Sequence, residues 1–340
     1  MEVKVSHTYP SDIALWDELC LKNSNLVQST HFDKVQEFYK QKPIYFEVWV
    51  DAKLVAGVKM YFWQSEKNFL TRMISKRLSQ FGEIVYSEEE NREWIIELLQ
   101  NKVIDYLKFN KIVTYVANGF YGGEDLLIAL RIKAKKESRF KIAFVNLDEE
   151  EEVLWSKVHS KHRNVIRKAI KNNVSFGSSQ DFNSFYSCLE STYDNQEKKP
   201  PNREYLLHRY MISKKDIEIY NSLWNSQLLS GAWVTIYGSS AYYEFGGSFP
   251  NSMGAGNYLQ WEIIKELKDR KIQKYYFGQI AFDFDSANLK FSEGISKFKI
   301  RFGVSSADSY KKTYTLKRIE YALWNALSLV STLVFKRNNS

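Results

Sequence analysis

LLSGAWVTIYGSSAYYEFG (residues 228–246) leads into NSMGAGNYLQWEIIKELKD (251–269) and then into KYYF (274–277). The first of these stretches holds two runs of β-branched and aromatic residues separated by a Gly-Ser-Ser turn, a composition typical of two antiparallel strands. In the second, apolar residues recur at helical spacing from Tyr258 to Asp269. The sequence therefore predicts a β-hairpin, a glycine loop, a helix and a further strand, in that order.

The glycine loop lies where the N-terminus of the predicted helix is expected. A helix N-terminus presents unpaired N–H groups and a partial positive charge, which suit a phosphate or an oxyanion. Gly254 and Gly256 allow a ligand to approach the backbone closely. We therefore expect Gly254, Ala255, Gly256 and Asn257 to bind an anionic group of a ligand or cofactor.

Length and composition indicate more than one globular domain. The chain has 340 residues, 44% of them hydrophobic and 16% aromatic, with only five prolines, so two domains of about 150 residues are expected. Two cysteines, Cys20 and Cys188, match no metal or redox spacing and predict a reduced compartment and no metal site. The N-terminus lacks a secretory signal pattern, and no stretch reaches the ~18 apolar residues of a membrane span. We expect a cytoplasmic protein.

The first half shows a similar order of elements. Strands are predicted at 44–50 and 54–63, followed by a helix at 92–109 and a strand at 111–116. LVAGVKMYFW (54–63) corresponds to LLSGAWVTIY of the second half, and the helix and strand that follow correspond likewise. The pattern predicts one fold repeated twice, although hairpin, helix and strand is a common order.

Between the halves, residues 147–172 predict one long amphipathic helix with acidic residues in its first turn and basic residues later. Residues 157–171 carry six Lys or Arg and no acid, in a chain whose net charge is +8. A solvated surface would explain this face as well as a polyanionic ligand would. His162 falls on the apolar side, where a packing histidine is expected. The candidates for phosphate or substrate binding are Lys161, Arg163, Arg167 and Lys168.

These elements resemble a known family. The hairpin, the loop N-x-x-G-x-G (251–256), the helix YLQWEIIKEL and the strand KYYF resemble the core of GNAT-type acyl-coenzyme A N-acyltransferases. The basic stretch SKHRNVIRKAIKNNVSF (160–176) together with the later FKIRFG (298–303) resembles the Fem-type branch of aminoacyl- and acyltransferases. The loop is a looser match than the rest.

The resemblance implies an α/β (α+β) fold of two tandem GNAT-like domains, each with a mixed, mostly antiparallel sheet flanked by helices. We expect an N-terminal domain at 1–146, a basic connecting helix at 147–173, a C-terminal domain with the active cleft at 174–313 and an amphipathic tail at 314–340. It further implies an acyltransferase in which an amine attacks the donor carbonyl directly, without a covalent enzyme intermediate.

Few side chains are indispensable for such chemistry, which needs positioning, proton removal and oxyanion stabilisation. The resemblance to the FK-x-x-FG lysine implies that Lys299 supplies a cation near the reacting carbonyl or a phosphate. Phe298 is a core aromatic by pattern and a further candidate for substrate contact. Glu244, Asp283 and Asp285 are candidate bases, each with a structural role as the alternative, and a water-mediated base is equally compatible.

The resemblance implies acyl-coenzyme A as a donor that is not tightly bound, with an acyl carrier protein or an aminoacyl-tRNA as alternatives. The long paired helices that many Fem enzymes insert are not evident between 173 and 226, which favours acyl-coenzyme A and an amino sugar of a cell-envelope glycan precursor. A peptidoglycan aminoacyltransferase and a non-catalytic assembly protein are the alternatives. The tail at 317–337 either packs on its domain or lies at the inner face of a membrane.

Overall fold

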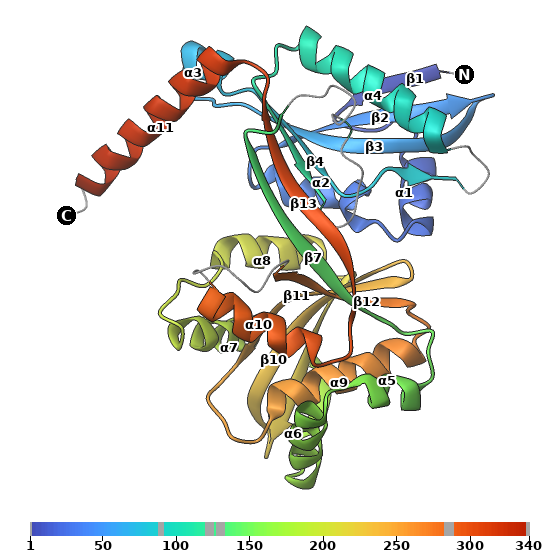
Figure 1. Ribbon diagram of the computed structural model, residues 1–340, viewed down its shortest axis with the longest axis vertical. Coiled ribbons are helices and arrows are strands. Elements are labelled where there is room, and N and C mark those ends of the chain that lie inside the picture. Colours follow the sequence, from blue (N-terminus) through green and yellow to red (C-terminus); the bar gives the residue numbers. More distant parts are fainter. Residues whose placement is uncertain (1, 88–91, 120–125, 127–132, 282–288, 338–340) are drawn as a thin grey trace. The chain divides into compact units, whose positions relative to one another are not determined.

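The computed structural model describes residues 2–87, 92–119, 126, 133–281 and 289–337. The chain forms two compact units (Figure 1). The first unit comprises residues 1–139 and 309–340, and the second comprises residues 140–308. The second unit is therefore inserted in sequence within the first. The compact units differ from the predicted extents, because the basic segment after residue 146 belongs to the second unit and β13 returns the chain to the first.

The first unit is built on a mixed sheet. Its strands are β1 (Glu2–His7), β2 (Lys42–Val50), β3 (Lys53–Trp63), β4 (Arg77–Phe81), β5 (Val85–Tyr86), β6 (Thr114–Asn118) and most of β13 (Ser305–Thr315). Its helices are α1 (Ile13–Lys22), η1 (Leu26–Gln28), α2 (His31–Glu37), α3 (Phe69–Ile74), α4 (Arg92–Phe109) and α11 (Arg318–Arg337). The order β1-β2-β3-β4-β6-β13 is antiparallel except for the parallel pair β4 and β6, which α4 connects.

The second unit repeats this plan. Its strands are most of β7 (Lys136–Asn146) together with β8 (Ser175–Ser179), β9 (Ile217–Trp224), β10 (Gln227–Tyr237), β11 (Ser240–Ser248) and β12 (Lys274–Ala281). Its helices are α5 (Glu151–Lys157), α6 (Ser160–Lys171), α7 (Phe182–Asp194), α8 (Arg203–Ile212), α9 (Ala255–Asp269) and α10 (Leu289–Ile300). The order β7-β12-β11-β10-β9-β8 again holds one parallel pair, β11 and β12, which α9 connects. The predicted repeat of one fold is confirmed.

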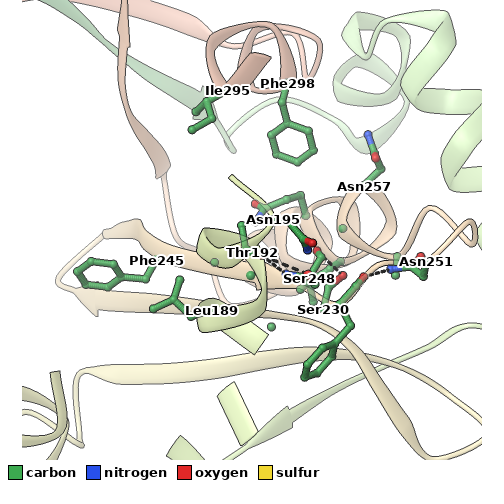
Figure 2. A pocket seen from close by; sticks show the side chains of 18 of the residues that line it. Leu189, Thr192, Asn195, Ser230, Phe245, Ser248, Asn251, Asn257, Ile295 and Phe298 are labelled. Carbon is green, nitrogen blue, oxygen red and sulfur yellow. Dashed lines mark hydrogen bonds between the residues drawn. The ribbon is translucent and has the colours of Figure 1, made fainter. Parts of the chain in front are cut away.

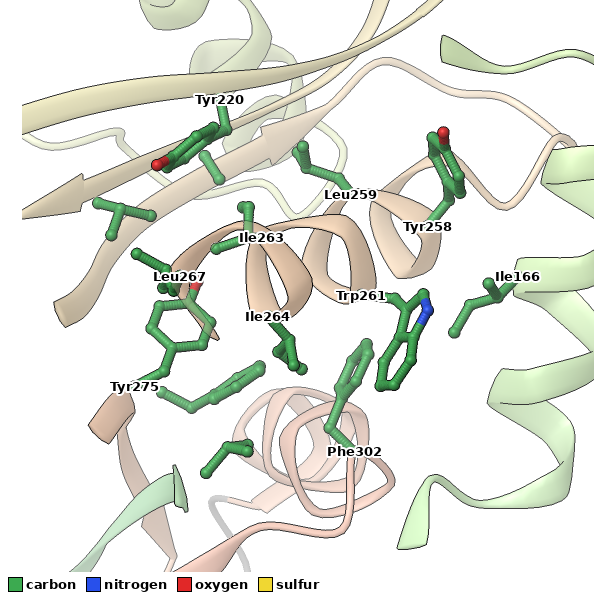
Figure 3. Close-up of a cluster of buried hydrophobic side chains, with 14 of the residues drawn as sticks. Ile166, Tyr220, Tyr258, Leu259, Trp261, Ile263, Ile264, Leu267, Tyr275 and Phe302 are labelled. Carbon is green, nitrogen blue, oxygen red and sulfur yellow. The ribbon is translucent and has the colours of Figure 1, made fainter. Parts of the chain in front are cut away.

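The core of the second unit gathers around α9. Ile263, Ile264 and Leu267 of α9 are buried in one cluster with Phe302, and Figure 3 shows Ile263 on the side of Tyr220 and Ile264 on the side of Phe302. Burying such side chains contributes about 1.5–3 kcal/mol each. The helix predicted from Tyr258 to Asp269 is thus the central packing element of this unit.

The prediction of a single helix at 147–172 is wrong, because the chain forms α5 and α6 with a break between them. Val158 and His159 adopt extended backbone angles, and the His159 side chain accepts a hydrogen bond from the Lys161 amide at 3.1 Å, which caps α6. The His159 amide in turn donates to the Arg301 carbonyl at 2.8 Å. Tertiary hydrogen bonds therefore interrupt a helical pattern that is continuous in sequence.

Candidate active site

A cavity of about 820 Å³ lies in the second unit (Figure 2). Its walls come from the second half of β11, the loop at 249–254, the first turn of α9, the end of α7 and one face of α10. The lining contains several of the residues predicted from sequence: Glu244, Gly254, Ala255, Gly256, Asn257, Phe298 and Lys299. The structure thus brings together the glycine loop and the FK motif.

The cavity lies where two parallel strands separate. Among the described residues, β11 pairs with β12 only at Ser240–Tyr242 against Lys274–Tyr276, whereas β12 pairs with β7 along its other edge from Lys274 to Ala281. Residues 243–248 of β11 line the cavity instead. The separation therefore gives a ligand access to one edge of a strand, where backbone groups can bind an extended molecule.

A β-bulge places Glu244 at this edge. The register between β10 and β11 passes from Trp233 opposite Phe245 to Val234 opposite Tyr243, so Glu244 is the extra residue. Both of its carboxylate oxygens accept hydrogen bonds from the guanidinium of Arg209 on α8, and the Thr235 hydroxyl donates to Oε1 at 2.6 Å. The carboxylate is thus engaged in a buried ion pair, which favours the structural alternative for Glu244 over a role as base.

The N-terminus of α9 opens into the cavity. Gly254 is its N-cap residue with φ +79°, and a Cβ atom there would lie 2.4 Å from Cγ1 of Val165 on α6. No side chain of the described residues caps this helix. The amides of its first turn are therefore available to a ligand, and glycine is required by both conformation and space.

Lys299 and Phe298 lie on the face of α10 that lines the cavity. The Lys299 ammonium donates to the Gln279 carbonyl at 2.9 Å, and burial lowers the pKa of this amine to about 8. Phe298 contacts both the cavity and the core, where its ring packs against Phe302. Lys299 is thus a cation held in place at the cavity wall.

His162 packs beneath these aromatic side chains. It is buried, its Nε2 lies 3.0 Å from the Phe298 carbonyl oxygen, and its ring contacts the rings of Phe298 and Phe302. Burial lowers the pKa of the imidazole. The expectation of a packing histidine is confirmed.

A group of hydroxyls forms the cavity wall opposite Phe298 (Figure 2), and the sequence analysis did not predict it. The Ser248 amide donates to the Thr192 hydroxyl at 2.7 Å, and the hydroxyls of Ser230 and Ser248 lie 2.8 Å apart (Figure 2). Asn195 and Asn257 also line the cavity. These residues come from separate elements and share no motif, so only the fold assembles them.

The basic residues of α6 divide into two groups. Arg163 donates to the carbonyls of Ser156 and Val158, at 2.9 and 2.8 Å, and so binds the C-terminus of α5. Arg167 lies over the ring of Trp155 at 5.5 Å.

Lys161 and Lys168 are exposed and lie four residues before and three after Val165, the residue that contacts the N-cap of α9. The described lining of the cavity includes none of the four basic residues. Lys161 and Lys168 therefore flank the α9 N-terminus without entering the cavity.

Two predicted bases, Asp283 and Asp285, lie outside the described residues. Their proposed role remains a prediction.

Comparison with known proteins agrees with this geometry. Residues 160–286 match the family described as acetyltransferase (GNAT) domain. Comparison with curated proteins gave no match.

Among solved structures, FemX is similar over 95% of this chain and 99% of its own, with 15% identity and a TM-score of 0.75. L-PGS from Bacillus licheniformis is similar over 96% and 98%, with 11% identity and a TM-score of 0.55. A tandem GNAT protein from the clavulanic acid biosynthesis pathway is similar over 92% and 98%, with 10% identity and a TM-score of 0.52.

At these identities the solved structures establish a shared fold, and the family match establishes the domain that lines the cavity. The chain is an acyltransferase that carries a GNAT acetyltransferase domain at residues 160–286, within a Fem-like fold of two units.

Proposed function

We propose that this protein transfers an acyl group, such as acetyl, from acyl-coenzyme A to the amine of a cell-envelope glycan precursor, such as a nucleotide- or lipid-linked amino sugar. The observation that carries the proposal is a single cavity lined by both the uncapped first turn of α9 and Lys299. The amides of the first turn of α9 suit the phosphates of a donor, and the Lys299 cation suits the negative charge that develops on the carbonyl oxygen during transfer.

The donor fits the cavity through its charges and its shape. The amides of Ala255, Gly256 and Asn257 would bind the pyrophosphate of coenzyme A, with Lys161 and Lys168 close enough to attract its remaining phosphate. The extended pantetheine arm would lie along residues 243–248, where β11 has separated from β12. The acyl carbonyl would then point toward α10.

In the reaction the amine nitrogen forms a bond to the thioester carbonyl, and the carbon–sulfur bond breaks to release coenzyme A. The Lys299 cation would stabilise the oxyanion of the tetrahedral intermediate, a contribution that is typically worth 10²–10³ in rate. Since Glu244 is held by Arg209, we propose that water in the cavity, rather than Glu244, accepts the amine proton. The hydroxyls of Thr192, Ser230 and Ser248 can hold that water.

An aminoacyl-tRNA-dependent transferase acting on a peptidoglycan precursor is the second candidate. It is supported by the fold shared with FemX over nearly the whole chain. Against it, the helices between 174 and 226 have 13 and 10 residues, too short for the long paired arm of many Fem enzymes. We therefore favour acyl-coenzyme A as the donor.

The test is calorimetric titration with acetyl-coenzyme A and desulfo-coenzyme A at moderate salt, which suppresses non-specific attraction to α6. We expect micromolar binding that Gly256→Val abolishes, because a side chain there would stand in front of the first-turn amides. Gly177→Val in β8, where a Cβ meets nothing within 4 Å, is the matched control.

Binding should be followed by turnover assays with nucleotide-linked amino sugars. Absence of coenzyme A binding, together with turnover of an aminoacyl-tRNA, would replace the proposal by the second candidate. Binding that both glycine variants retain would remove the α9 N-terminus from the site.

A further inference from the structure

Two helices of the first unit expose apolar side chains to solvent. On α3, Phe69 is 76% exposed, and Leu70 and Met73 accompany it. On α11, Ile319 is 75% exposed, with Leu323 and Leu327 following at intervals of four residues. Residues spaced by four lie on one face of a helix, so α11 turns an apolar stripe outward rather than inward.

These two helices are neighbours in the first unit. α3 and α11 contact each other within the first unit, and Figure 1 shows the start of α11 beside α3. The inward side of α11 is fixed by Trp324, whose ring packs against the ring of Trp63 at 5.8 Å between centroids. We call the exposed side chains of Phe69, Leu70, Met73, Ile319, Leu323 and Leu327 the apolar helix face. The unit holds it in place, and none of the described residues of the unit buries it.

The charges around the apolar helix face are mostly positive. Lys67 and Arg72 on or next to α3, and Arg318 at the start of α11, are exposed. The acid at the start of α11, Glu320, is paired with Lys317 at 3.5 Å, and Glu66 before α3 is paired with Lys40. An apolar face rimmed by exposed cations matches an anionic lipid surface, whose headgroups attract the cations while its acyl chains accept the apolar side chains.

We propose that the apolar helix face binds the surface of an anionic membrane, with α3 and α11 lying in the plane of the interface. Over the described residues, no helix is long and apolar enough to cross a bilayer. Binding in the plane requires only a half-buried amphipathic helix. A single apolar stripe with a basic rim fits that geometry, and the inference does not rest on the proposed activity.

The experiment is cosedimentation of the full chain with vesicles of phosphatidylcholine alone and of phosphatidylcholine mixed equally with phosphatidylglycerol. We expect binding to the mixed vesicles only. Phe69→Gln and Leu323→Gln should each weaken it roughly tenfold, since each removes one large inserted side chain. Arg72→Gln and Arg318→Gln should each weaken it about fivefold, an effect that added salt reproduces in the wild type.

Phe109→Gln is the matched control, because Phe109 is an equally apolar residue of the same unit, 87% exposed at the end of α4. This variant should bind like the wild type. Failure of the wild type to bind mixed vesicles would overturn the proposal. So would a dimer in lipid-free sedimentation that Leu323→Gln dissociates, because the face would then be a subunit interface.

Discussion

Removing the charge of Glu244 tests how the bulge of β11 is held. Glu244→Gln keeps the shape of the side chain but leaves the Arg209 guanidinium without its anion, in a pair whose side chains are 5% and 11% exposed. An uncompensated charge at such a site costs about 3–5 kcal/mol. Arg209→Met should cost a similar amount, because it strands the carboxylate instead. Against a total stability of about 5–15 kcal/mol, either change is severe.

The double variant Arg209→Met with Glu244→Gln removes both charges together. We expect it to be destabilised by no more than either single variant, so that the coupling energy of the cycle is about 3 kcal/mol or more. Urea unfolding followed by circular dichroism gives the three free energies of unfolding. Additive single effects would refute the ion pair as the element that holds the bulge.

The same variants separate support from catalysis. If Glu244 only holds the strand, the double variant should recover most of the turnover that the single variants lose through misfolding. If Glu244 is the base, turnover should stay low in every variant that lacks it. A folded double variant with activity reduced by about 10² or more would therefore restore Glu244 as a base.

Three further outcomes are expected. Because burial lowers the pKa of Lys299 to about 8, its cation is present below that pH and lost above it, so kcat/KM should fall above pH 8 in the wild type. In Lys299→Arg, whose guanidinium stays charged, the fall should disappear, and an unchanged profile would exclude Lys299 as its source. Gly254→Ala combines a left-handed backbone with a close contact and should lower the free energy of unfolding by about 2–4 kcal/mol; a loss below about 1 kcal/mol in urea unfolding would contradict the packing of α6 on α9. Replacing Lys161 and Lys168 by Gln should weaken coenzyme A binding several-fold in calorimetry and flatten its salt dependence without altering stability. Arg163→Gln should instead lower the free energy of unfolding by about 1 kcal/mol and leave binding unchanged. Equal effects of the two changes would contradict the division of the basic residues of α6 into ligand-attracting lysines and a structural arginine.

The hairpin, α9 and β12 could be predicted because local signals and tertiary packing agree there. Turn residues, period-two runs and helical spacing each indicate the element that forms. The glycine loop was located for the same reason, since its conformation is determined by its own residues and by the helix that follows.

Other features depend on partners distant in sequence. His159 ends one helix and begins another because its amide bonds to Arg301, and nothing within residues 147–172 announces that partner. Arg209 on α8 donates hydrogen bonds to both carboxylate oxygens of Glu244, a residue predicted as a base. The segment that carries Arg209 has no motif, so the sequence did not predict this ion pair. Pattern reasoning finds candidate side chains, but only tertiary contacts show whether they are free.

The order of the two units along the chain bears on how the protein is made. β6 of the first unit pairs with β13, whose residues Lys311–Thr315 follow the whole second unit in sequence. During synthesis from the N-terminus, the first unit therefore waits with an unpaired strand edge while about 170 further residues emerge, and unpaired edges promote association between chains. The second unit is continuous and can close first. A nascent chain stalled before residue 311 should therefore hold a folded second unit and a first unit whose β6 edge is unpaired. Pairing of β13 with β6 is then the step that completes the sheet of the first unit.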